Sequence, residues 1–142
     1  MKTLKIIRSS PSSDQRLIME QEIKHSSAET VNDRNSAIAL GSGDLPVYAT
    51  PSMIALMENA AKKAVEQLLQ PGETTVGSEI SVRHTKPSIT GAQITATAKL
   101  ASKEGRKLSF TVEACDEKGT IGTGTHIRYI VDKERFIQKA AI

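Results

Sequence analysis

The sequence contains one long helical pattern, and every pattern that follows it is typical of a β-strand. Between residues 49 and 69, apolar side chains recur three and four positions apart, which is the spacing of a buried helix face. Thr50 and Pro51 fit the N-cap and first position of this helix. Pro71 and Gly72 follow its end, so we expect a helix over 51–69. Its apolar stripe has to be buried against another layer.

That layer is predicted by four segments in which apolar residues occupy every second position, the period of a half-buried strand. Short turns containing Gly105 and Gly119 separate the last three segments, which predicts antiparallel hairpins. Residues 17–31 are ambiguous and fit a short strand, whereas 32–48 are typical of a long loop, which in a small domain is usually functional or mobile. The sequence therefore predicts an α+β fold in which one long helix covers an antiparallel sheet of at least four strands. The four segments are 75–85, 91–102, 107–115 and 120–132.

Size and composition restrict the class of protein. A chain of 142 residues is expected to form one domain, which we place at 16–142, with 1–15 as a flexible tail or an added edge strand. No apolar run approaches the ~20 residues of a membrane span, and the N-terminal apolar stretch is too short for a signal peptide. The single cysteine, Cys115, fits a reducing cytoplasm. A net charge of +3 that is mixed along the chain, with few aromatic residues, disfavours nucleic-acid binding and is compatible with a small phosphorylated ligand.

Two polar residues on the predicted helix are candidates for function. Glu58 projects at the edge of the apolar stripe, where a carboxylate is costly unless something pairs with it. Its alternative role is to lean out into water. Thr50 stands at the helix N-terminus, where free N–H groups and the helix dipole favour a polarised carbonyl or an anion. Its alternative role is that of a cap alone.

His84 is the third candidate. It shares a strand face with Val76, Ile80 and Val82, so its ring is expected to point toward the helix or to lie at the end of the core. It is either a core histidine or one half of an acid/base pair with Glu58.

The remaining histidines predict no metal site. Neither His25 nor His126 has zinc-ligand spacing to His84. His126 and Arg128 alternate on the last strand, opposite Ile127 and Tyr129, which predicts a solvent face or a wall that meets a phosphate. The glycines at 122 and 124 indicate the close approach of a ligand or of another backbone.

Four motifs, in order and at similar spacing, resemble those of the hotdog-fold thioesterases, in particular the branch that includes fluoroacetyl-CoA thioesterase. The resemblance extends over residues 40–137. It implies a hotdog fold, in which a strongly curved antiparallel sheet wraps a long helix, and a homodimer in which two sheets join edge to edge with active sites between them. The motifs are ATPSMIALME (49–58), PGETTVGSEISVRHT (71–85), EGRKLSF (104–110) and IGTGTHIR (121–128).

The same resemblance implies roles for five residues. Thr50, Glu58 and His84 match the catalytic set, Gly77 matches the glycine whose backbone lies near the thioester carbonyl, and Arg128 matches an arginine that contacts the CoA portion. The expected activity is hydrolysis of a short-chain acyl-CoA to free acid and CoA, without a cofactor. Attack by the threonine hydroxyl and attack by an activated water both remain open. The alternatives are a non-catalytic acyl-CoA-binding protein and a hotdog enoyl-CoA hydratase.

Overall fold

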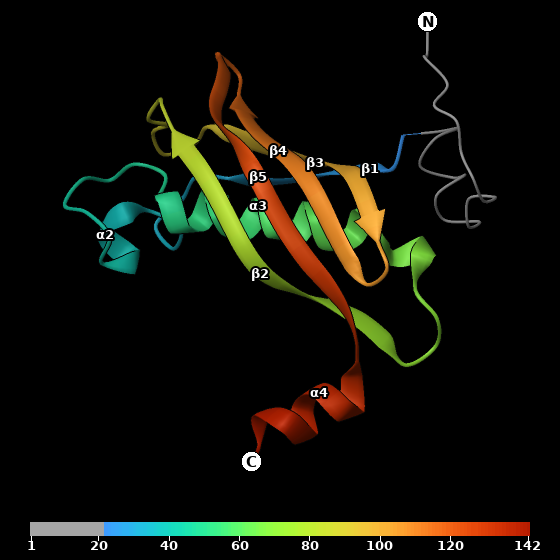
Figure 1. Ribbon diagram of the computed structural model, residues 1–142. Helices are drawn as coiled ribbons and strands as arrows, with labels where there is room; N and C mark the ends of the chain where they lie inside the picture. Colours follow the sequence, from blue (N-terminus) through green and yellow to red (C-terminus); the bar gives the residue numbers. More distant parts are fainter. Residues whose placement is uncertain (1–21) are drawn as a thin grey trace, which may run out of the picture.

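The computed structural model describes residues 22–142, in which one antiparallel sheet of five strands curls around a long helix (Figure 1). The order across the sheet is β1-β3-β4-β5-β2, so β1 and β2 are its edges. The predicted α+β arrangement is confirmed, whereas the boundary expected at residue 15 lies outside the described residues. The strands are β1 (Lys24–Thr30), β2 (Glu73–His84), β3 (Gln93–Glu104), β4 (Lys107–Asp116) and β5 (Gly119–Asp132).

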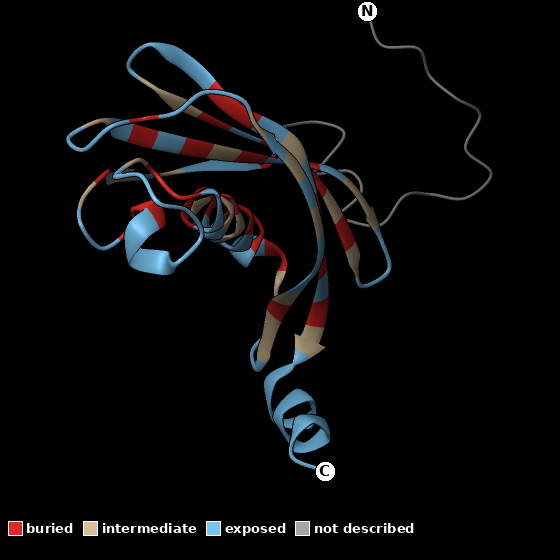
Figure 2. Cartoon of the chain, turned by 90° about the vertical axis from the view of Figure 1, so that its left-hand side faces the viewer, coloured by how far each residue is buried: buried red, intermediate tan, exposed pale blue. Residues whose placement is uncertain are grey.

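Helix α3 (Thr50–Ala64) lies against the concave face of the sheet and contributes its apolar stripe to the core. The apolar stripe predicted from the sequence is buried: the side chains of Met53 and Met57 are fully covered, and they belong to one cluster with Ile94 and Phe110 of the sheet. Fully burying a side chain of this size contributes about 1.5–3 kcal/mol. Figure 2 shows the result as buried bands that alternate with exposed ones along the strands.

The helix ends earlier than the predicted residue 69. The α-helix stops at Ala64, and a short 3₁₀ turn, η1 (Glu66–Leu68), continues it toward Pro71. A 3₁₀ turn tightens the last part of a helix, so the apolar spacing persists into η1 and carries Leu68 into the core.

Two short helices were not predicted. Helix α2 (Ala37–Leu40) lies within the segment expected to be a loop, and the hydroxyl of Ser36 caps it by accepting from the N–H of Ala39 at 3.2 Å. Helix α4 (Lys133–Ala140) follows β5, is capped by Asp132 and projects from the body of the protein (Figure 1). No residue of α4 is buried. Both are too short to show a helical periodicity in the sequence.

The glycines of β5 mark a close approach of backbone. A Cβ on Gly124 would overlap the carbonyl oxygen of Ser81 in β2. A Cβ on Gly122 would lie 2.6 Å from the sulfur of Met53 and 2.9 Å from the carbonyl oxygen of Arg83. Of the two expectations for these glycines, the structure shows the approach of another backbone.

The faces of β2 and β5 differ from those predicted. A β-bulge between Gly77 and Glu79 shifts the alternation of β2, so Thr75 is buried in place of Val76. In β5, His126 and Arg128 point to the core side and are 1% and 7% exposed. Of the two expectations for this face, the solvent face is wrong, and the contact with a phosphate stays a prediction.

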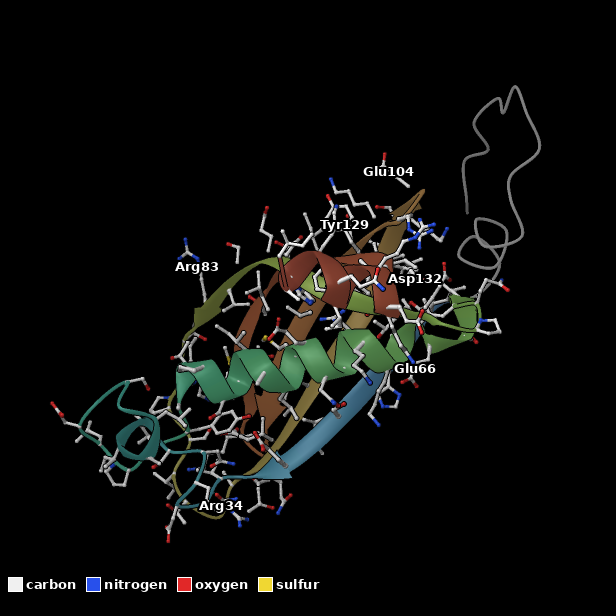
Figure 3. All side chains as sticks on the ribbon, turned by 90° about the horizontal axis from the view of Figure 1, so that it is seen from below. Arg34, Glu66, Arg83, Glu104, Tyr129 and Asp132 are labelled. Carbon is white, nitrogen blue, oxygen red and sulfur yellow. The ribbon has the colours of Figure 1, made fainter. Side chains whose placement is uncertain are left out.

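Tyr129 is 39% exposed on the opposite face of β5. In Figure 3 it is labelled, with Arg83, on the side of the sheet away from α3. The predicted orientation of β5 was wrong because the apolar residues Ile127 and Tyr129 were expected on its buried face. The buried face instead carries two polar residues that hydrogen-bond to each other.

Candidate active site

Thr50 and His84 form a hydrogen-bonded pair at one end of α3. The Thr50 hydroxyl lies 2.8 Å from Nδ1 of His84, the last residue of β2. The N-cap of α3 is Ala49, without a side-chain cap, and Thr50 is the first helical residue. The expected capping role of Thr50 is therefore wrong, and its hydroxyl is available to the histidine instead.

His84 is suited to accept the proton of Thr50. Burial lowers the pKa of His84 below its ordinary value of 6.5, although the backbone of Lys86 opposes this shift. The imidazole is therefore neutral at pH 7. Its Nε2 atom is buried and has no hydrogen-bond partner among the described residues. A hydroxyl in contact with a neutral imidazole is the arrangement of an activated nucleophile and its base.

A pocket of about 280 Å³ opens beside this pair. The segment before α3 forms one of its sides, including the buried ring of Tyr48, whose hydroxyl donates to Glu29 Oε2 at 2.5 Å. Burial and then this bond raise the pKa of Tyr48, so the phenol stays protonated. The pocket is small and has apolar and polar walls, which fits a short acyl group. It is lined by Ala37, Ser42, Val47, Tyr48, Thr50, His84, Thr85, Lys86 and Pro87.

Glu58 belongs to a second group of residues, gathered around Gly77. A Cβ built on Gly77 would lie 2.8 Å from Glu58 Oε2, 3.2 Å from His126 Cε1 and 3.4 Å from Arg128 Nη1. Glu58 is half-buried, so its carboxylate leans toward the sheet and not away into water. The missing side chain of Gly77 leaves the space on which the other three residues converge.

Arg128 is held inside the sheet by hydrogen bonds. Its Nε donates to the hydroxyl of Thr75 at 2.8 Å, its Nη2 donates to the Thr75 carbonyl at 2.9 Å, and Nη1 is 3.2 Å from Nε2 of His126. Burial lowers the pKa of Arg128, and the nearby charge of Glu58 opposes this shift. The structure thus places Arg128 in the core and not at an exposed strand end. Its contact with the CoA portion stays a prediction.

Sequence reasoning missed Thr75 and His126 as members of this group. His126 shares its face of β5 with Gly124 and Arg128, so the glycine spacing was an available sign that this face meets other atoms closely. Thr75 gave no comparable signal, because only the bulge at Gly77 turns it inward.

The two groups are separate within one chain. Thr50 and Glu58 are eight residues apart on α3, which corresponds to an axial rise of ~12 Å. The chain therefore pairs Thr50 with His84 and Glu58 with Gly77, but it does not bring Glu58 to the Thr50–His84 pair.

Two further observations concern the described part of the chain. Residues 22–142 contain no group of three or more His, Cys, Asp or Glu side chains placed to hold a metal ion. Over the same range, no helix has the length and apolar character needed to cross a membrane.

Comparison with known proteins identifies the family. Residues 31–134 match the family model described as fluoroacetyl-CoA-specific thioesterase. The chain belongs to this thioesterase family. It is 44% identical over 93 residues to the fluoroacetyl-CoA thioesterase of Streptantibioticus cattleyicolor. The aligned region covers 66% of this chain and 67% of that protein. The predicted thioesterase activity is thereby confirmed.

Solved structures of thioesterases have the same fold. The fluoroacetyl-CoA thioesterase FlK matches with a TM-score of 0.78 and 35% identity, over 83% of this chain and 92% of that one. A thioesterase superfamily member from Thermus thermophilus matches with a TM-score of 0.78 and 26% identity, over 85% and 90% of the two chains. These matches confirm the predicted hotdog fold.

Proposed function

We propose that this chain hydrolyses short-chain acyl-CoA thioesters to free acid and CoA, in active sites that two copies of the chain build together. The observation that carries the proposal is the 2.8 Å contact between the Thr50 hydroxyl and His84 Nδ1, which supplies a nucleophile with its base beside a small pocket. The family supports the substrate class, since a solved FlK variant holds fluoroacetate and CoA.

The reaction proceeds through two displacements. His84 Nδ1 takes the proton of Thr50 as Oγ attacks the carbonyl carbon, and the N–H of Gly77 stabilises the oxyanion. The C–S bond breaks, and the CoA thiolate leaves with the proton from His84. Water then attacks the acyl ester of Thr50 while Glu58 takes one of its protons. That proton returns to Thr50 Oγ as the free acid departs.

A second copy is needed because Glu58 lies too far from Thr50 in its own chain. Strand β2 is a sheet edge of twelve residues, and such an edge invites pairing with another strand. If two β2 strands pair antiparallel about an axis between Ile80 and Ser81, Gly77 lies opposite His84 of the second copy. Each Thr50–His84 pair then meets the Glu58 and Gly77 group of the other chain. We propose a homodimer of this kind.

Mixing two inactive variants tests the shared site. Thr50→Ala and Glu58→Gln are each expected to lower steady-state thiol release from acetyl-CoA by at least ~100-fold. After unfolding and refolding together in equal amounts, half of the dimers are mixed. Each mixed dimer contains one site with both substitutions and one intact site, so the activity is expected to recover to about a quarter of wild type.

The matched control mixes Thr50→Ala with His84→Ala. Both substitutions affect the same half of a shared site, so no mixed dimer regains an intact site and no activity is expected. An active monomer, or a Thr50→Ala and Glu58→Gln mixture that stays inactive although mixed dimers form, would contradict the shared site. A wild-type protein that binds acyl-CoA esters without releasing thiol would instead favour the non-catalytic alternative.

The proposal also includes a location in the cell. A cytoplasmic location is part of this proposal, supported by a single cysteine and by the absence of any helix within residues 22–142 that could span a membrane.

A further inference from the structure

We infer that His126 is a positioning residue for this reaction: it holds Arg128 and the bulge of β2 around Glu58. The inference rests on the proposed function, because it assigns Glu58 to the reaction. His126 does not line the Thr50–His84 pocket. It is nevertheless among the largest fully buried side chains of the described residues, and both of its ring nitrogens have partners.

The two partners determine the protonation of the ring. Nδ1 lies 2.8 Å from the carbonyl oxygen of Glu79, which can only accept, so Nδ1 carries the hydrogen. Nε2 lies 3.2 Å from Nη1 of Arg128, which can only donate, so Nε2 is the acceptor. The ring is therefore neutral, in the Nδ1–H form. The ring of Phe110 stacks on it, with centroids 5.9 Å apart and an interplanar angle of 29°.

Each of the two hydrogen bonds of the His126 ring holds one part of the group formed by Gly77, Glu58, His126 and Arg128. The Nδ1 bond holds the carbonyl of Glu79, which follows the bulge that shapes the backbone at Gly77. The Nε2 bond fixes Nη1 of Arg128, which would lie 3.4 Å from a Gly77 Cβ, across from the Glu58 carboxylate. Thr75 holds the other two nitrogens of the guanidinium, so His126 completes its orientation.

The two hydrogen bonds of the His126 ring are expected to affect different quantities, one the stability of the fold and the other the rate of turnover. The Nδ1 bond satisfies a backbone carbonyl, so its loss should mainly affect stability. The Nε2 bond orients a cation beside Glu58, so its loss should mainly affect the rate of the chemical step, in which small displacements are costly.

Two substitutions remove one bond each. His126→Asn keeps an N–H donor near the position of Nδ1 but has no acceptor near Nε2. His126→Gln places an amide oxygen near Nε2 but loses the Nδ1 donor. We expect His126→Asn to lower kcat by about 10- to 100-fold at nearly unchanged KM, with a fall in Tm similar to that of His126→Gln. We expect His126→Gln to keep kcat close to wild type while Tm falls by about 4 °C.

The control is His25→Gln, at an exposed histidine of β1, which should change neither quantity. A purely structural role for His126 predicts a different pattern, in which kcat follows Tm across both variants. That pattern, or wild-type turnover in His126→Asn, would overturn the inference.

Nuclear magnetic resonance of ¹⁵N-labelled protein tests the network without catalysis. The chain has three histidines, so single variants assign the ring signals. At neutral pH, His126 should show a protonated Nδ1 and an unprotonated Nε2. The Nε–H signal of Arg128, protected by Thr75, should persist in His126→Gln and broaden in His126→Asn. An Nε2–H or charged ring would refute the network even if the protein proved not to hydrolyse acyl-CoA.

Discussion

Replacing Gly77 by alanine is the most direct test of the group around Glu58. The added methyl carbon would lie 2.8 Å from Glu58 Oε2, whereas ordinary contact begins at 3.4 Å, so the carboxylate has to withdraw by about 0.6 Å. Gly77 is not among the described glycines with positive φ, so alanine fits its backbone. The atom that must move is the end of a flexible side chain, and the fold should survive.

The cost should therefore fall on turnover. A displacement of ~1 Å at a reacting group can cost about 100-fold, so 0.6 Å predicts a loss of about 10- to 100-fold in kcat for Gly77→Ala. Tm should change little, because the ring of His126 and the guanidinium of Arg128, at 3.2 and 3.4 Å, need only small adjustments. Thiol release from acetyl-CoA under saturating conditions measures kcat, and a thermal melt measures Tm.

A double-mutant cycle identifies the cause. If the methyl group acts by displacing Glu58, then Gly77→Ala adds little to the loss already caused by Glu58→Gln. Fully additive losses would show that the methyl group acts elsewhere, for example on the Gly77 N–H. Wild-type turnover in Gly77→Ala would refute the reasoning altogether.

Three further predictions follow from the geometry. Glu58→Gln should lower kcat by at least ~100-fold, whereas Glu66→Gln, at an exposed position of the adjoining 3₁₀ turn, should not. Because burial lowers the pKa of His84, its neutral form persists as the pH falls, so the acid limb of kcat/KM should lie below pH 6.5; a limb at or above 6.5 would contradict this. Gly124→Ala should destabilise the fold by about 1–3 kcal/mol, because its methyl group meets the backbone oxygen of Ser81; an unchanged Tm would argue against this close approach.

The fold was predictable because its signals are local. A helix repeats at 3.6 residues and a strand at two, so α3 and the four strands β2 to β5 were each visible in their own segment. Helix α4 was not predicted, since its eight residues are fewer than the stretch over which a helical repeat is recognised. The bulge at Gly77 also left no recognisable pattern in the sequence. One inserted residue was enough to bury Thr75 in place of Val76.

The site was only partly predictable for the same reason. Thr50, Glu58 and His84 were chosen from their residue types, their positions and the family resemblance, and the structure joins the first to the third. The contacts among these three residues depend on distances in the folded chain, and a local sequence pattern does not give those distances. Of the two expectations for the face of His126 and Arg128, the solvent face was wrong because a side chain's polarity predicts exposure only when no buried partner satisfies it, and here each satisfies the other.

Gly122 of β5 limits how the packing beneath the first turn of α3 can be redesigned. At Gly122 there is no room for even a methyl group, because the sulfur of Met53 already fills the space where a side chain would begin. A library that varies position 122 alone is therefore expected to return glycine. Methionine is flexible and adaptable in shape, and Met53 stands in the first turn of the helix that begins with Thr50. Changing residue 53 to alanine would remove the sulfur contact, but the carbonyl oxygen of Arg83 would still lie 2.9 Å from a Cβ at 122, so a library that varies both positions should also return glycine at 122.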